Sequence, residues 1–125
     1  MTKKDLIVLA VDDDMINLKL LKSMLMKSEN VKEVVEAKNG SDAIGVLKGR
    51  DDIDLILLDI IMPIMGGIEM LKVVRADDNL RQVPIIVLTT DETKKSDALE
   101  YGANGFLMKP IRTVDLFNKM ATVIV

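Results

Sequence analysis

The sequence predicts an α/β fold in which a parallel sheet of five strands is covered by helices on both faces. Leu6–Val11 and Leu55–Leu58 are wholly apolar runs, the pattern of strands that are buried on both faces. Stretches with helical spacing of apolar residues separate the strand-like runs, so that strand and helix alternate five times. This alternation is typical of parallel strands that are joined by right-handed crossover helices.

The composition fits one globular domain and excludes several kinds of site. The chain has 125 residues, of which 49% are hydrophobic and 30% are charged, enough for one domain with a real core. It has no cysteine and no histidine, which excludes disulfides, thiol chemistry and histidine–metal sites. With a net charge of −3 and 2% aromatic residues, we expect no direct binding to nucleic acid. No apolar run reaches the length of a membrane span and no signal peptide is visible, so we expect a cytoplasmic protein without membrane contact.

The first part of the chain predicts two strands and two helices. Met15–Ser28 has apolar residues at helical spacing, and Asp14 stands where it can cap that helix. Val31–Ala37 is a shorter and more polar strand, which we expect nearer an edge of the sheet. Ser41 can cap a second helix, which Gly49 ends.

The central stretch carries a single acid at the end of a strand. Asp59 follows the apolar run Leu55–Leu58 at once, so we expect its carboxylate at the carboxyl end of a buried strand. Pro63 forbids further strand, and Gly66 and Gly67 permit a sharp turn before the third helix. Taken alone, Asp59 could equally be a strand-end carboxylate that only keeps the protein soluble.

The last part of the chain predicts two more strands and two more helices. Pro84 opens the strand Ile85–Leu88, and a charged helix follows over Glu92–Tyr101. Gly105–Met108 is the fifth strand, and the last helix begins near Thr113. The nine methionines of the chain are expected to fill irregular gaps in the core.

Polar residues stand at the ends of four of these strands: Asp12 and Asp13, Asp59, Thr89, and Lys109. The carboxyl ends of parallel strands share one edge of a sheet, so these side chains should converge on one crevice. Three packed carboxylates repel one another, and a hard cation such as Mg²⁺ would relieve that repulsion. A carboxylate in such a site can attack phosphorus, while a lysine neutralises the transferred phosphoryl group and a threonine hydroxyl bonds one of its oxygens.

Four motifs resemble the receiver domain of two-component response regulators. They are Val-Asp-Asp-Asp (11–14), Leu-Leu-Asp-Ile-Ile-Met-Pro (57–63), Pro-Ile-Ile-Val-Leu-Thr (84–89) and Gly-Phe-Leu-Met-Lys-Pro (105–110). Each motif is weak alone, but four in order on the right elements are highly specific, and the resemblance covers essentially the whole chain. It implies a flavodoxin-like fold with strand order 2-1-3-4-5, and a single receiver domain over residues 1–125.

The resemblance also implies a role for each residue of the cluster. Asp59 would accept a phosphoryl group from a sensor histidine kinase. Asp12 and Asp13 would hold Mg²⁺ together with Asp59 and the backbone carbonyl of Ile61. Lys109 would contact the phosphoryl group, and the peptide bond that joins it to the following proline is expected to be cis. The simpler alternative, an acidic cap favoured by the helix dipole, suits Asp14 but not the two acids before it.

A switch and its output surface are implied in the same way. Thr89 and Phe106 would form the switch pair, although Phe106 stands where many members of the family have tyrosine. The pair would change the surface made by the Glu92–Tyr101 helix, the Gly105–Met108 strand and the last helix. That surface would dock a downstream protein, an attached output domain or a second copy of the chain.

The resemblance implies a switch with self-catalysed phosphotransfer and autodephosphorylation only, and not an enzyme that acts on other substrates. A phosphorelay intermediate that passes the phosphoryl group on is not separable from it by sequence. Phosphatases and mutases with an aspartate nucleophile commonly carry a second acid two residues later, where this chain has Ile61. A pseudo-receiver that only binds partners is disfavoured by the intact cluster. An apolar Ile61 cannot position an attacking water, which predicts a longer-lived phosphorylated state.

Overall fold

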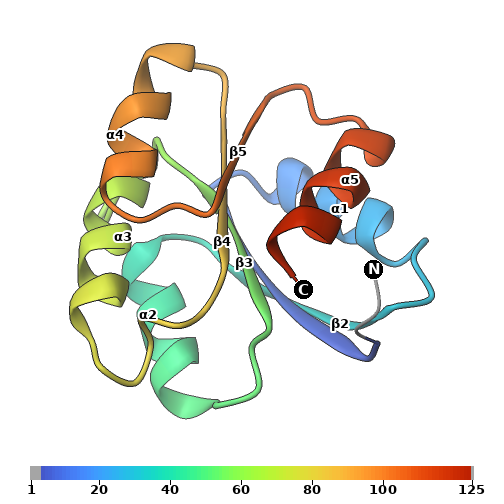
Figure 1. Ribbon diagram of the computed structural model, residues 1–125, viewed down its shortest axis with the longest axis horizontal. Coiled ribbons are helices and arrows are strands. Elements are labelled where there is room, and N and C mark those ends of the chain that lie inside the picture. Colours follow the sequence, from blue (N-terminus) through green and yellow to red (C-terminus); the bar gives the residue numbers. More distant parts are fainter. Residues whose placement is uncertain (1–3, 125) are drawn as a thin grey trace.

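The computed structural model describes residues 4–124, which form a five-stranded parallel sheet between two layers of helices (Figure 1). The expected domain bounds of 1–125 include residues 1–3 and 125, which lie outside the described residues. The strands are β1 (Leu6–Val11), β2 (Val31–Ala37), β3 (Leu55–Asp59), β4 (Ile85–Thr89) and β5 (Gly105–Met108). The helices are α1 (Met15–Leu25), α2 (Gly40–Gly49), α3 (Gly67–Ala76), the 3₁₀ turn η1 (Glu92–Lys94), α4 (Lys95–Glu100) and α5 (Thr113–Val123).

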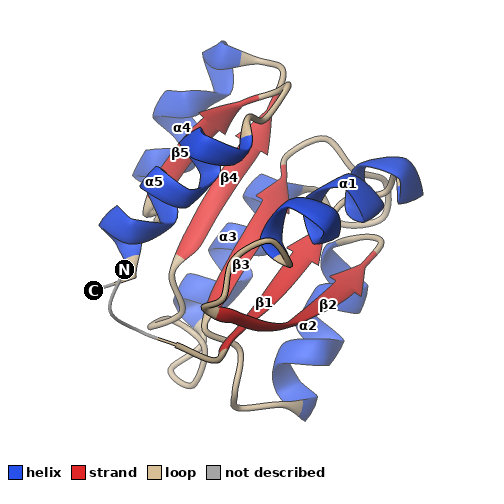
Figure 2. Ribbon diagram, turned by 90° about the vertical axis from the view of Figure 1, so that its right-hand side faces the viewer, coloured by secondary structure: helices blue, strands red, loops and turns tan. Residues whose placement is uncertain are grey.

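The strand order is β2-β1-β3-β4-β5, which confirms the flavodoxin-like order (Figure 2). All four neighbouring pairs are parallel. Strand β1 is wholly apolar and β3 is apolar up to its last residue, Asp59; both are buried at every position, as is β4. The more polar strand β2 lies at one edge and mixes buried with exposed residues, as its sequence predicts.

Successive side chains along each central strand pack into two separate hydrophobic cores, one on each face of the sheet. In β4, Val87 packs with the residues of α2, α3 and α4, and Leu88 packs with those of α1 and α5. The helices are divided in the same way in Figure 1, where α2, α3 and α4 lie on one side of the sheet and α1 and α5 on the other. This division buries both faces of the sheet and leaves its ends open to carry a site.

Two predicted helix boundaries are wrong. Ser41 does not cap α2, because Asn39 takes that place and its side-chain oxygen accepts from the Asp42 N–H at 2.8 Å. Asparagine is as good a cap as serine, and with Asn39 as the cap the helix begins at Gly40, two residues earlier than a Ser41 cap would allow. Helix α1 ends at Leu25 and not at Ser28, since the chain leaves it through a hydrogen-bonded turn.

Two further expectations need correction. The helix predicted over Glu92–Tyr101 begins as the 3₁₀ turn η1, which Asp91 caps, and only Lys95–Glu100 is α-helical. The methionines are not all core filler. Met70 and Met120 are fully buried, whereas 58% of Met15, 48% of Met26 and 40% of Met108 are exposed. The exposed ones lie on surfaces that no other described part of the chain covers.

Candidate functional site

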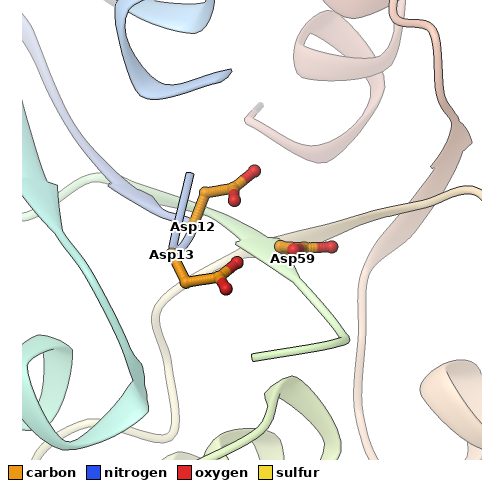
Figure 3. Close-up of side chains that lie close together, drawn as sticks. All are labelled: Asp12, Asp13 and Asp59. Carbon is orange, nitrogen blue, oxygen red and sulfur yellow. The ribbon is translucent and has the colours of Figure 1, made fainter. Parts of the chain in front are cut away.

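Three carboxylates meet at the carboxyl edge of the sheet. Asp12 and Asp13 directly follow β1, and Asp59 is the last residue of the neighbouring strand β3. One oxygen of each carboxylate lies within 4.8 Å of the others (Figure 3). Asp12 and Asp59 are buried, with 1% and 8% of their surface exposed, while Asp13 is exposed. A grouping of three oxygen donors with one open side is a set that can hold a hard divalent cation.

Asp14, the third acid of the Asp12–Asp14 run, caps α1 and is not part of the carboxylate cluster. Asp14 is the N-cap of α1, and its Oδ1 accepts from the Ile16 N–H at 2.8 Å, as predicted. The Asp14 N–H in turn donates to Asp12 Oδ1 at 2.9 Å. One oxygen of Asp12 is therefore fixed by the backbone, and the chain after β1 has a defined path past the site.

Gly67 allows the loop after β3 to close tightly against the base of Asp59. A Cβ atom on Gly67 would lie 2.5 Å from the Asp59 carbonyl oxygen, so no other residue fits without a shift. The Gly67 N–H donates to the Ile60 carbonyl oxygen at 2.8 Å. The loop between them exposes 63% of Ile61 and 81% of Ile64, and Ile64 has a left-handed backbone with φ of 69°. The metal-ligand role of the Ile61 carbonyl remains a prediction.

Lys109 brings a positive charge to the acids from the far strand. Its Nζ lies 3.0 Å from Asp12 Oδ2 and 3.5 Å from Asp59 Oδ1. Its backbone N–H donates to the Thr89 carbonyl oxygen at 2.8 Å, which extends the β4–β5 ladder by one step. The bond from Lys109 to Pro110 is cis, as expected. The ammonium group thus compensates two buried acids.

Thr89 lies at the end of β4 and is 1% exposed. Its Oγ1 accepts from the Asp91 N–H at 3.2 Å. Side chains alternate along a strand, so Thr89 faces the same side of the sheet as Val87. Phe106 is the partner of Val87 in the β4–β5 ladder and packs against the core on that side. Thr89 and Phe106 therefore share one face of the sheet, and their roles as a switch pair remain a prediction.

The electrostatics of Asp59 reflect its position at this edge. Burial raises the pKa of the Asp59 carboxyl above its ordinary value of 3.8. The charge of Lys109 opposes that shift, and the charge of Asp12 adds to it. Folding therefore makes the charged form of Asp59 less favourable than in the unfolded chain.

This shift predicts that Asp59→Asn stabilises the fold at neutral pH. When folding raises the pKa of a carboxyl, protonation of that carboxyl favours the folded state. This contribution to stability is fully present at pH values below the pKa in the unfolded chain, and it is lost as the pH rises through the pKa in the folded protein. Removing the charge should therefore raise the free energy of unfolding at pH 7 by about 1 kcal/mol. Near pH 4 and below, the advantage should disappear. Urea unfolding at both pH values measures the difference, with the exposed Asp51→Asn as control; an Asp59→Asn protein no more stable at pH 7 would contradict it.

A feature that the sequence did not reveal is an apolar cavity of about 410 Å³ beside the acids. It lies between α1 and the segment after β5, and its walls include Leu20, Met24 and Ile111. Asp12 and Lys109 line it as well, so it opens onto the charged site. The only signal in the sequence was the excess of apolar residues in α1, which helical spacing alone assigns to the core.

The fold and the site together define an α/β domain with an acidic centre at the strand ends. The family model of the response regulator receiver domain matches residues 8–121. The chain belongs to this family. Receiver domains are in general non-enzymatic switches of phosphorylation-dependent signalling, with Mg²⁺ and a phosphoaspartate as typical features. Among residues 4–124, no helix has both the length and the apolar content to cross a membrane.

Curated relatives include short and long proteins. Chemotaxis protein CheY-3 of Vibrio cholerae is 31% identical over 119 residues, which cover 94% of this chain and 90% of that protein. The two-component response regulator ORR7 of Oryza sativa subsp. japonica is 31% identical over 111 residues, 87% of this chain. The chain spans 52% of the length of ORR7, about half of it.

Solved structures share the fold closely. The CheX–CheY–BeF3–Mg²⁺ complex from Borrelia burgdorferi matches with a TM-score of 0.87 at 28% identity, over 96% of this chain and 90% of that one. The receiver domain of the sensor histidine kinase PA1611 from Pseudomonas aeruginosa has a TM-score of 0.84 at 27% identity, over 95% of this chain and 97% of that one. In that structure a magnesium ion is coordinated in the active site cleft.

Proposed function

We propose that residues 1–125 are one receiver domain, which acts in the cytoplasm as a phosphorylation-activated switch. Asp59 accepts a phosphoryl group from a sensor histidine kinase, and the surface of α4, β5 and α5 then changes to control a partner. The observation that carries this proposal is the position of Asp59, a buried strand-end carboxylate with two other acids within 4.8 Å and a lysine ammonium at 3.5 Å.

The transfer step uses the Asp59 carboxylate as the nucleophile. One oxygen attacks phosphorus and forms an O–P bond as the P–N bond to the donor imidazole breaks, and the imidazole nitrogen keeps the electron pair and takes up a proton. Lys109 is close enough to neutralise part of the charge on the phosphoryl oxygens. The step needs no other acid or base from this chain.

The donor set fits Mg²⁺, because all of its side-chain atoms are carboxylate oxygens grouped around one open side. Asp12, Asp13, Asp59 and the Ile61 carbonyl would hold the ion. Bound there, it would supply further neutralisation of the phosphoryl oxygens. The solved receiver domain of PA1611 carries magnesium in the corresponding cleft, which supports the same assignment here.

The output step uses the pair on the α3 and α4 side of the sheet. The Thr89 hydroxyl can turn from the Asp91 N–H and donate to a phosphoryl oxygen on Asp59. Phe106 lies on the same face and can move into the space that Thr89 leaves. Such an exchange shifts an equilibrium between two packings.

The surface next to this pair is suited to a partner. It exposes large apolar side chains from α4, from the residue that follows α4, from β5 and from α5, which are Leu99, Tyr101, Met108 and Val114. Lys95 is exposed beside them. A downstream protein, an attached output domain or a second copy of the chain can use this mixture of apolar and basic groups. We infer that the kinase docks in the cavity beside Asp12 and Lys109, because these two lining residues adjoin Asp59.

The experiment that tests this function is incubation with acetyl phosphate, followed by intact-mass measurement. The protein should gain one phosphoryl group in the presence of Mg²⁺ and little when the metal is removed with a chelator. No added mass under either condition would show a pseudo-receiver that only binds partners. More than one added group would mean that labelling is not confined to a single acid.

A further inference from the structure

The Arg75 side chain, on α3, is half-buried and donates hydrogen bonds to oxygen atoms of other segments. Nε donates to the Gly102 carbonyl at 2.9 Å, and Nη2 donates to Asn104 Oδ1 at 2.8 Å. Nη1 donates to the carbonyls of Arg81 at 3.1 Å and Val83 at 2.7 Å. The guanidinium therefore joins α3 to the segment before β4 and to the turn between α4 and β5. Hydrogen bonds from a charged donor are stronger than neutral ones, so this link is firm.

The turn that Arg75 holds is itself fixed closely. Gly102 has a φ of +109°, and a Cβ atom there would lie 2.8 Å from Arg75 Cγ. Asn104 pairs with Ile85 in both directions, because its backbone N–H donates to the Ile85 carbonyl at 2.8 Å and its Oδ1 accepts from the Ile85 N–H at 2.9 Å. Burial lowers the pKa of Arg75, so this cation is held among neutral acceptors at a cost.

A second contact from α3 reaches the same end of α4. The Lys72 ammonium lies over the Tyr101 ring, 4.3 Å from its centroid. Ala98 is fully buried, and its carbonyl accepts from the Ala103 N–H at 2.9 Å. The carboxyl end of α4 is thus held by core packing, by a backbone bond and by two side chains of α3.

The amino end of this segment, η1 and the first turn of α4, has fewer contacts with the rest of the described chain than its carboxyl end. None of the residues Glu92–Lys94 of η1 is buried. Asp91 caps the turn by accepting from the Thr93 N–H at 3.0 Å and from the Thr93 hydroxyl at 2.5 Å, but both bonds are exposed. Lys94, the N-cap of α4, makes no side-chain capping bond. Thr89, from which the proposed signal comes, lies directly before this weakly held end.

We propose that Arg75 is the pivot of the switch. When Thr89 turns toward a phosphoryl group, η1 and the first turn of α4 swing, while Arg75 keeps the carboxyl end of α4 on α3 and the start of β5 in register. Arg75 is a positioning residue, since it touches none of the reacting groups and acts through the α4–β5 turn. This inference rests on the proposed function.

Amide hydrogen exchange tests the unequal hold on the two ends. In the wild-type protein, the Gly102 and Ala103 amides should exchange at least about tenfold more slowly than those of Lys94 and Lys95. Arg75→Met keeps most of the side-chain volume and should speed exchange at Gly102 and Ala103 by about tenfold or more. Equal rates at the two ends of the wild-type segment would overturn the proposal.

A matched control and a conservative variant separate the pivot from a general loss of stability. Arg81→Met removes an exposed arginine from the same region without touching the hydrogen bonds of Arg75, and should leave exchange at Gly102 unchanged. Arg75→Lys should lie between wild type and Arg75→Met, because one amine can reach only part of the acceptor set. If Arg75→Met does not fold, Arg75→Lys and the wild-type comparison still decide the question.

Beryllofluoride with Mg²⁺, a stable mimic of the phosphoryl group, tests the motion. In the wild-type protein, the amide shifts caused by the mimic should be larger at residues 92–95 than at Gly102 and Ala103. In Arg75→Met, the shifts at Gly102 and Ala103 should become as large as those at residues 92–95. Wild-type shifts of equal size at both ends would overturn the pivot. If the mimic shifts no amide resonances around Asp59, the proposed function is wrong and Arg75 is not a pivot. The exchange rates then show only whether Arg75 anchors the turn in a static structure.

Discussion

Asp59→Asn should reduce phosphoryl labelling by acetyl phosphate by about 10³-fold or more, which takes it below detection. The carboxamide lacks the charged oxygen that attacks phosphorus, and no other group of the cluster has the same position at the end of β3. The fold should survive the change, because the side chains have nearly the same shape and Lys109 keeps its 3.0 Å contact with Asp12. Intact mass after incubation with Mg²⁺ measures the loss.

Asp14→Asn is the matched control for this labelling experiment. Asp14 lies two residues from Asp12 in the chain but caps α1, and asparagine caps a helix as well as aspartate. This variant should therefore be labelled like the wild type. Labelling that persists in Asp59→Asn, on Asp12 or Asp13, would move the phosphoacceptor to that residue.

Lys109→Met should lower the free energy of unfolding by about 2 kcal/mol in the absence of Mg²⁺. Its ammonium is the charge that lies between Asp12 and Asp59, and the side chain of Asp12 is only 1% exposed. Without that charge, two buried acids repel each other and lose a donor. Urea unfolding measures the change, and saturating Mg²⁺ should restore part of it, because a bound cation stabilises the folded state that binds it.

Two control variants distinguish the loss of a charge from a general packing defect. Asp13→Asn changes the charge of the same cluster in the opposite direction, so it should raise stability without Mg²⁺ and reduce the stabilisation that Mg²⁺ provides. Lys95→Met removes an exposed lysine and should have almost no effect. An unchanged Lys109→Met protein, or an Asp13→Asn protein that is less stable than the wild type, would show that charge repulsion does not govern this edge.

Much of this architecture could be predicted because its signals are local. The apolar runs of β1 and β3 are buried at every position, and the polar strand β2 lies at the edge. Parallel strands share one direction, so acids at their carboxyl ends had to meet at one edge. The same rule brought Lys109 to Asp12 across 97 positions of sequence. The strand order itself came from the family resemblance, because periodicity cannot rank the strands.

The features that could not be predicted depend on segments that meet only in three dimensions. The cap of α2 is Asn39 and not the predicted Ser41. Both residue types are good caps, so the sequence alone could not choose between them, and the backbone geometry decides. The role of Arg75 depends on α3, the segment before β4 and the turn after α4 coming together, and an arginine on a helix reads as a solvated charge. Met15, at the start of α1, is exposed although it belongs to a run with the same helical spacing as buried residues.

We expect a change at Asp59 to reach the α4, β5 and α5 surface through Thr89. The measurement that tests it most directly is the set of amide shifts that beryllofluoride and Mg²⁺ produce in the wild type and in Thr89→Ala. In the wild type, shifts should extend from the acids to Phe106 and α4, because Thr89 and Phe106 share one face of the sheet. Thr89→Ala should still bind the mimic and should lose most of the distant shifts. Wild-type shifts that stop at the loops bearing Asp12, Asp59 and Lys109 would contradict the switch and would fit a phosphorelay intermediate.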